Sequence, residues 1–155
     1  MERTIVLTWL APEQSVKSES VSDFIASDYV NALLSGLMSM VQISTQNDYK
    51  FKDYELMHKI KDILDTGYPV DSDLNLALYI KIDFDAGWVN ISFPREQGYL
   101  SIEHSIHIVS LAVYRFIVQS ADPIKARKKI NESIYSAFTN TDYINIEVED
   151  AFLNK

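Results

Sequence analysis

The chain has 155 residues, no cysteine and a formal net charge of -8. The lack of cysteine excludes disulfides, thiolate nucleophiles, iron–sulfur clusters and cysteine-based zinc sites. The acidic balance argues against a general affinity for nucleic acid, because phosphates attract cations. Hydrophobic residues make up 47% of the chain, which is enough to bury a core, so we predict a single globular domain over residues 1–155.

The N-terminus lacks the pattern of a signal peptide, because the apolar run after Thr4 is short and is broken by Ala11 and Pro12. The longest apolar stretch, residues 29–43, contains Asn, Ser and Gln side chains and is shorter than the roughly 20 residues of a membrane span. We therefore predict a cytoplasmic protein with no membrane contact.

The first half of the chain predicts one strand and two helices. Residues 4–10 are β-rich and favour a strand, whereas the polar segment 11–19 favours a loop. Apolar spacing predicts a helix over residues 21–44, capped by Ser20 or Ser22, and a second helix over residues 53–65.

The second half begins with the clearest pattern in the chain. Residues 74–84 alternate between apolar and other residues, which is typical of a half-buried strand. Asp85-Ala86-Gly87 predicts a hairpin turn, with glycine supplying the left-handed conformation. Val89, Ile91 and Phe93 then form the partner strand, which Pro94 ends.

Two helices and a strand complete the prediction. Ser101 caps a helix that runs to about Ser120, and Asp122-Pro123 is a favourable start for a fourth helix. The last strand is expected over residues 143–149.

Two heptads resemble each other. Both Tyr79-Ile80-Lys81-Ile82-Asp83-Phe84-Asp85 and Tyr143-Ile144-Asn145-Ile146-Glu147-Val148-Glu149 read tyrosine, isoleucine, polar, isoleucine, acid, apolar, acid. The predicted element order is β-α-α-β-β-α-α-β, compatible with two pseudo-symmetric βααβ halves. The predicted class is α+β, with a four-stranded antiparallel sheet and four helices on one face.

Acidic side chains collect at the ends of these two strands, and they are our candidates for partner binding. They are Asp83, Asp85, Glu147, Glu149 and Asp150. An acidic patch of this kind steers a basic protein toward itself. The alternative is that the charges only prevent edge-to-edge aggregation of the sheet.

Three other groups of residues are weaker candidates. His104 and His107 share one side of a helix, where they are either metal ligands or core residues. With Tyr79 and Tyr143 they could instead line a pocket between sheet and helices. Cations crowd the start of the fourth helix, where they either contact a phosphate or pair with the chain's own acids: Lys125, Arg127, Lys128 and Lys129.

No catalytic signature, glycine-rich phosphate loop or metal motif is present in the sequence, so we expect no enzyme activity and no cofactor or metal. The leading hypothesis is a small acidic module that neutralises a basic protein, such as a bacterial immunity protein against a toxin domain or a phage inhibitor of a defence nuclease. The alternatives are a homo-oligomeric assembly protein, a homodimer included, that associates through its two most apolar helices, and a small-molecule sensor or enzyme. No direct contact with nucleic acid is expected.

Overall fold

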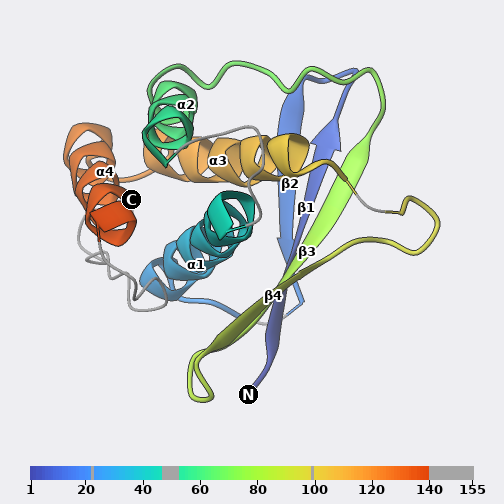
Figure 1. Cartoon of the computed structure of the whole chain (residues 1–155), viewed down its shortest axis with the longest axis horizontal. Coiled ribbons are helices and arrows are strands. Elements are labelled where there is room, and N and C mark those ends of the chain that lie inside the picture. The colour runs from blue at the N-terminus through green and yellow to red at the C-terminus, as the bar shows by residue number, and fades with distance from the viewer. Residues whose placement is uncertain (22, 47–52, 99, 140–155) are drawn as a thin grey trace.

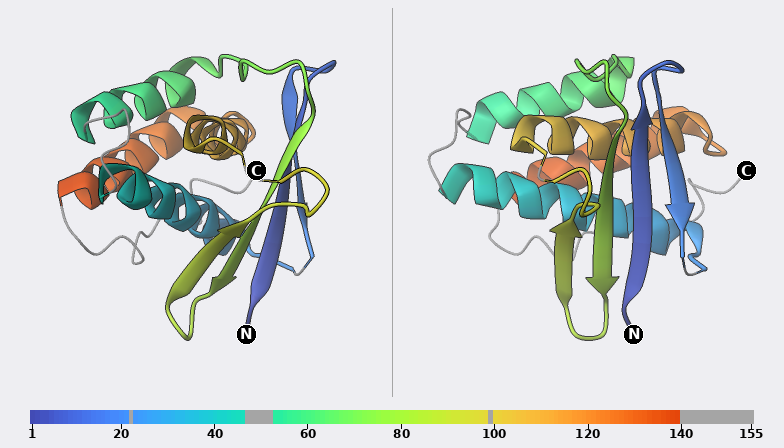
Figure 2. Two further views of the ribbon diagram at one scale, coloured as in Figure 1. Left: turned by 45° about the vertical axis from the view of Figure 1, so that its right-hand side comes forward. Right: turned by 90° about the vertical axis from the view of Figure 1, so that its right-hand side faces the viewer.

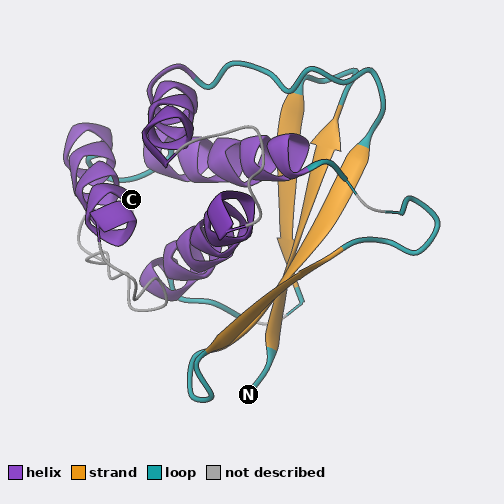
Figure 3. Ribbon diagram, viewed as in Figure 1, coloured by secondary structure: helices purple, strands orange, loops and turns teal. Residues whose placement is uncertain are grey.

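The computed structural model describes residues 1–21, 23–46, 53–98 and 100–139. Within these residues the chain forms four strands and four helices (Figures 1 and 3). In chain order they are β1 (Arg3–Leu10), β2 (Ser15–Ser20), α1 (Ala26–Gln46), α2 (Asp53–Thr66), β3 (Leu76–Asp83), β4 (Trp88–Ser92), α3 (Ile102–Val118) and α4 (Pro123–Thr139).

The four strands form one antiparallel sheet in the order β2-β1-β3-β4. All four helices lie on the same side of this sheet, and the right-hand view of Figure 2 shows the strands in front of the helices. Helices α1 and α3 contact the strands directly, while α2 and α4 form an outer layer (Figures 1 and 2). The predicted α+β class, with its four-stranded antiparallel sheet and four helices, is therefore confirmed.

The structure contains one strand, β2, that the sequence did not predict. Residues 15–20, expected to be a loop, form the edge strand β2. Its sequence, Ser-Val-Lys-Ser-Glu-Ser, carries a single apolar side chain, Val16, because an edge strand with one solvated face needs little apolar surface. The strand predicted over residues 143–149 lies outside the described residues, and so does the second copy of the heptad.

Helix α1 begins later than predicted. It starts at Ala26 rather than Val21, because strand β2 extends to Ser20; the other predicted cap, Ser22, lies outside the described residues. Asp28 therefore occupies the first turn in place of Asp23, and Ser20 is not the cap. The other predicted helices are confirmed, including the start of α3, where the Ser101 hydroxyl accepts a hydrogen bond from the His104 backbone.

The element order of the described residues agrees with the predicted order apart from the added strand β2 and the predicted last strand, which is not described. With β2 included, the described chain divides into two ββαα halves. The two hairpins correspond when 73 is added to each residue number of the first. Leu10, which pairs with Ser15, then corresponds to Asp83, which pairs with Trp88. The same offset carries Gln14 (φ 51°) onto Gly87 (φ 75°), so both hairpin turns place a left-handed residue at the same position. The buried residues correspond as well: Ile5, Leu7 and Trp9 match Leu78, Ile80 and Ile82.

The two most apolar helices, α1 and α3, are covered within the chain. They pack against each other and against the sheet, with α2 and α4 outside them (Figure 1). Gly36 of α1 allows a close approach, since a Cβ atom there would lie 3.1 Å from Ile80 and 3.2 Å from Ile91. The apolar surface of these helices is thus buried within the molecule. Their apolar composition therefore gives no support to self-association.

Candidate functional site

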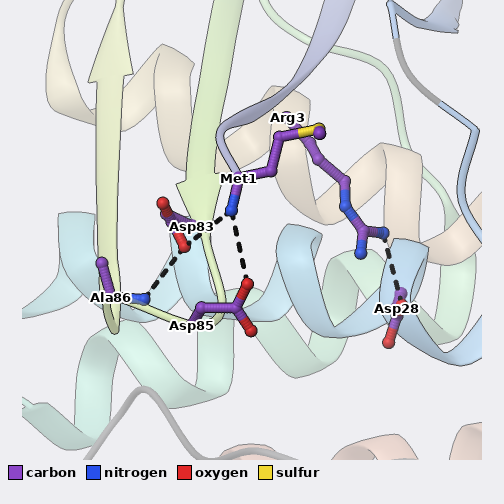
Figure 4. Close-up of polar contacts among 6 residues, drawn as sticks. All are labelled: Met1, Arg3, Asp28, Asp83, Asp85 and Ala86. Atoms are coloured by element: carbon purple, nitrogen blue, oxygen red, sulfur yellow. Dashed lines mark hydrogen bonds and ion pairs between the residues drawn. The ribbon is translucent and has the colours of Figure 1, made fainter.

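The two predicted acids that the structure describes, Asp83 and Asp85, lie together at the turn between β3 and β4 (Figure 4). Asp83 Oδ1 accepts hydrogen bonds from the Ala86 backbone N–H at 2.9 Å and from the Met1 amine at 3.4 Å. Asp85 Oδ2 also accepts from the Met1 amine at 3.4 Å. Figure 4 shows both carboxylates converging on this single nitrogen.

The two carboxylates have different environments. The Asp83 side chain is only 17% exposed, and its hydrogen bond from Ala86 N–H, followed by the contact with the Met1 amine, lowers the pKa of its carboxyl group. Asp83 therefore mainly fixes the turn. The Asp85 side chain is 92% exposed, which leaves it accessible to a partner.

The nearest arginine faces away from this acidic turn. Arg3 Nη1 pairs with Asp28 of α1 at 3.3 Å, and its guanidinium lies over the rings of Phe24 and Phe84 at 5.1 and 5.5 Å (Figure 4 shows the ion pair). Among the described residues, the Met1 amine is the only cation within ion-pair distance of Asp83 and Asp85, and Lys81 lies two residues before Asp83 on the same face of β3.

An exposed tryptophan stands next to the acidic turn. Trp88 is directly opposite Asp83 in the β3–β4 register, and it is 38% exposed. Cross-strand partners share one face of a sheet, and Ile82 faces the helices, so Asp83 and Trp88 both belong to the open face. No described element covers this face (Figure 2, right). We call Asp83, Asp85 and Trp88 the hairpin patch.

Only part of the predicted acidic surface can be placed. Glu147, Glu149 and Asp150 lie outside the described residues, so their distance from the hairpin patch remains a prediction. Trp88 was not among the predicted site residues, although its place two residues before Asn90, on the polar side of β4, indicates an exposed ring.

The two histidines hold a loop rather than meet at an open site. His104 Nε2 contacts the Asp71 carbonyl at 3.1 Å, and His107 Nε2 contacts the Tyr68 carbonyl at 2.9 Å. Because a carbonyl can only accept, Nε2 of each ring carries the proton. His107 is 6% exposed and packs edge-on against Tyr68 at 4.8 Å, so both rings fasten the loop before β3 onto α3.

Burial lowers the pKa of His107, with the Tyr68 carbonyl acting in the opposite direction. The folded protein therefore binds this proton less readily than the unfolded chain, so His107 lowers stability as the pH falls through about 6.5, the ordinary histidine value. We expect the free energy of unfolding to drop between pH 7.5 and 5.5, and to drop less in His107→Gln, whose amide can still donate to Tyr68. Urea denaturation at both pH values measures this, and an identical drop in both proteins would contradict it.

The remaining sequence candidates do not converge. Tyr79 lies on the open face of β3, on the opposite side of the sheet from the histidines, so the predicted pocket is not formed by these residues. Tyr143 is outside the described residues. At the start of α4, Arg127 Nε donates to the Leu64 carbonyl at 3.2 Å and lies 4.0 Å from Asp65, which ties α4 to α2.

No protein-family model matches this chain, and neither the curated proteins nor the solved structures that were searched include a match. Among the described residues, no group of three or more histidine, aspartate and glutamate side chains is arranged to hold a metal ion. None of the helices in the same part of the chain combines the length and the hydrophobicity that crossing a membrane requires.

Proposed function

We propose that this protein is a small cytoplasmic binding module that neutralises a basic partner protein, in the manner of an immunity protein or a phage inhibitor of a nuclease. The observation that carries the proposal is the hairpin patch, in which a 92% exposed aspartate stands beside a partly exposed tryptophan on an open sheet face. No catalytic role is assigned to any residue.

The charge of the chain supports a basic partner. A net charge of -8 creates a field that accelerates encounter with a positively charged protein, and an exposed carboxylate at the edge of an interface acts mainly on the association rate. The lack of cysteine is in keeping with a reducing cytoplasm.

The tryptophan supports a protein as the partner. Tryptophan, tyrosine and arginine dominate the binding energy of protein interfaces. For tryptophan the reason is a large rigid ring that buries much apolar area at little entropic cost. Trp88 has this character, and on the same face Tyr79 and Asn90 lie along the same two strands. The partner would therefore cover the β3–β4 half of the open face.

Affinity capture from the native host, with elution at low and then high salt, tests this proposal. We expect the wild-type protein to retain one basic protein that high salt releases. Trp88→Ala should weaken the affinity for that protein by about tenfold or more, since a tryptophan at the centre of an interface typically contributes about 2 kcal/mol or more.

Tyr135→Ala is the matched control, because Tyr135 is 59% exposed on α4, away from the sheet. It should capture the same protein as well as the wild type does. If the wild-type protein retains nothing basic, or if Trp88→Ala and Tyr135→Ala bind alike, the hairpin patch is not the binding surface.

A further inference from the structure

A separate pocket of about 520 Å³ lies at the opposite edge of the sheet, between β2 and the C-terminal half of α3. It does not include the hairpin patch or the histidines. Its volume is within the usual range of small-molecule sites, which extends from about 300 to 1,000 Å³. The residues that define its chemistry are Ser18, Phe24, Tyr29, Arg115, Phe116 and Gln119.

Arg115 supplies a positive charge that the described residues do not neutralise. Its Nη1 donates to the backbone carbonyl of Val16 in β2 at 2.6 Å, and none of the described carboxylates forms an ion pair with it. A guanidinium carries five N–H donors, so most of them remain for a ligand.

The wall beside Arg115 is aromatic. The rings of Tyr29 and Phe116 stack with their centroids 5.2 Å apart and their planes at 22°, and Phe24 meets Tyr29 edge-on at 6.1 Å. An aromatic cluster of this kind offers apolar contact to the ring of an aromatic ligand.

The hydroxyl group of Tyr29 adds a fixed polar point to this wall. It is hydrogen-bonded to the Ser18 hydroxyl. Burial raises the pKa of Tyr29 to about 12, with Arg115 acting in the opposite direction. The phenol therefore stays neutral, so it does not repel an anion bound beside it.

We infer that this pocket binds a small aromatic monocarboxylate, with its carboxylate on the Arg115 guanidinium and its ring along Tyr29 and Phe116. The Arg115 guanidinium and a carboxylate are complementary in shape as well as in charge. The aromatic wall favours a flat organic acid over inorganic phosphate, which has no apolar surface to bury.

The opposite edge of the sheet provides an internal control. At β4, a pocket of about 440 Å³ also contains an arginine, Arg95, but there the described aromatic lining is Phe93 alone. Arg95 is exposed, as Arg115 is, and lies at the other end of the strand order.

The test is a titration of the full-length, isotope-labelled protein followed by amide NMR. The probes are 2-naphthoate, its neutral analogue 2-naphthamide, and inorganic phosphate. We expect 2-naphthoate to cause saturable shifts at Ser18, Phe116 and Gln119. We expect 2-naphthamide and phosphate each to bind at least about tenfold more weakly, because a hydrogen bond to a charged group typically contributes about 1.5–3 kcal/mol.

Two variants complete the test. Arg115→Gln should weaken 2-naphthoate binding by about tenfold or more, whereas Arg95→Gln should leave it unchanged. Equal binding of naphthoate and naphthamide to the wild-type protein would overturn the inference without any variant, so it stays testable if Arg115→Gln does not fold. Absence of saturable shifts, or phosphate binding as tight as that of naphthoate, would overturn it too, and Arg115 would then serve only to block the edge of β2.

Discussion

Trp9→Ala should lower the free energy of unfolding by about 3–5 kcal/mol, the usual cost of truncating a fully buried large aromatic residue. Trp9 is 1% exposed and belongs to the central strand β1, which pairs with both β2 and β3. Its indole Nε1 also donates to the Ser72 carbonyl at 3.2 Å, so the side chain holds the loop before β3 as well as filling the core. Chemical denaturation monitored by circular dichroism measures the loss.

The chain has two tryptophans, and the second is the natural control. Trp88→Ala should change the free energy of unfolding by less than about 1 kcal/mol, since its ring lies on the open face. Trp9→Phe should cost an intermediate amount, because it keeps much of the ring but loses the hydrogen bond to Ser72. If Trp9→Ala and Trp88→Ala were equally destabilising, the placement of one tryptophan in the core and the other on the surface would be wrong.

Gly67→Ala should cost about 2–4 kcal/mol, although it adds only one methyl group. Gly67 ends α2 with φ +64°, and its N–H donates to the Ile63 carbonyl at 2.7 Å, as in a left-handed helix cap. A Cβ atom there would lie 2.4 Å from the ring of Tyr114, so alanine meets both backbone strain and a side-chain clash.

Gly87→Ala separates these two causes. Gly87 has a similar φ of +75° but nothing within 4 Å of the added Cβ, so it should lose only the backbone component of about 1–2 kcal/mol. Tyr114→Ala removes the ring that the added Cβ would meet. The double variant Gly67→Ala/Tyr114→Ala should therefore lose less free energy of unfolding than the two single variants lose in sum. Additive costs in the double variant would contradict the predicted clash.

Local patterns in the sequence predicted most of the fold. The alternation before Asp83 and the caps at Ser101 and Asp122 fix β3, α3 and α4, because these signals depend on neighbours within a few residues. Strand β2 was missed because its pairing with β1 supplies the stability that its own polar sequence does not indicate. Once β2 is assigned, the two hairpins match in register and the ββαα repeat becomes visible.

The candidate sites were less predictable, since they depend on contacts between distant residues. The acidic turn was found because Asp83 and Asp85 are close in sequence. The pocket at Arg115 was not, because the arginine meets Val16 across 99 residues and the meeting point is the strand that was missed. The pocket hypothesis placed Tyr79 between sheet and helices, although the alternation of residues 74–84 puts it on the same side of the strand as Lys81 and Asp83, where the structure has it.

The central claim, that the acidic turn steers a basic partner, is tested most directly by the association rate of the captured protein with Asp85→Lys. We expect this rate to fall several-fold at low salt and the difference to shrink at high salt, because screening removes steering between exposed charges. Asp62→Lys, the same charge change on the exposed surface of α2, should leave the rate much closer to that of the wild type. Equal rates for Asp85→Lys and Asp62→Lys at low salt would contradict the account.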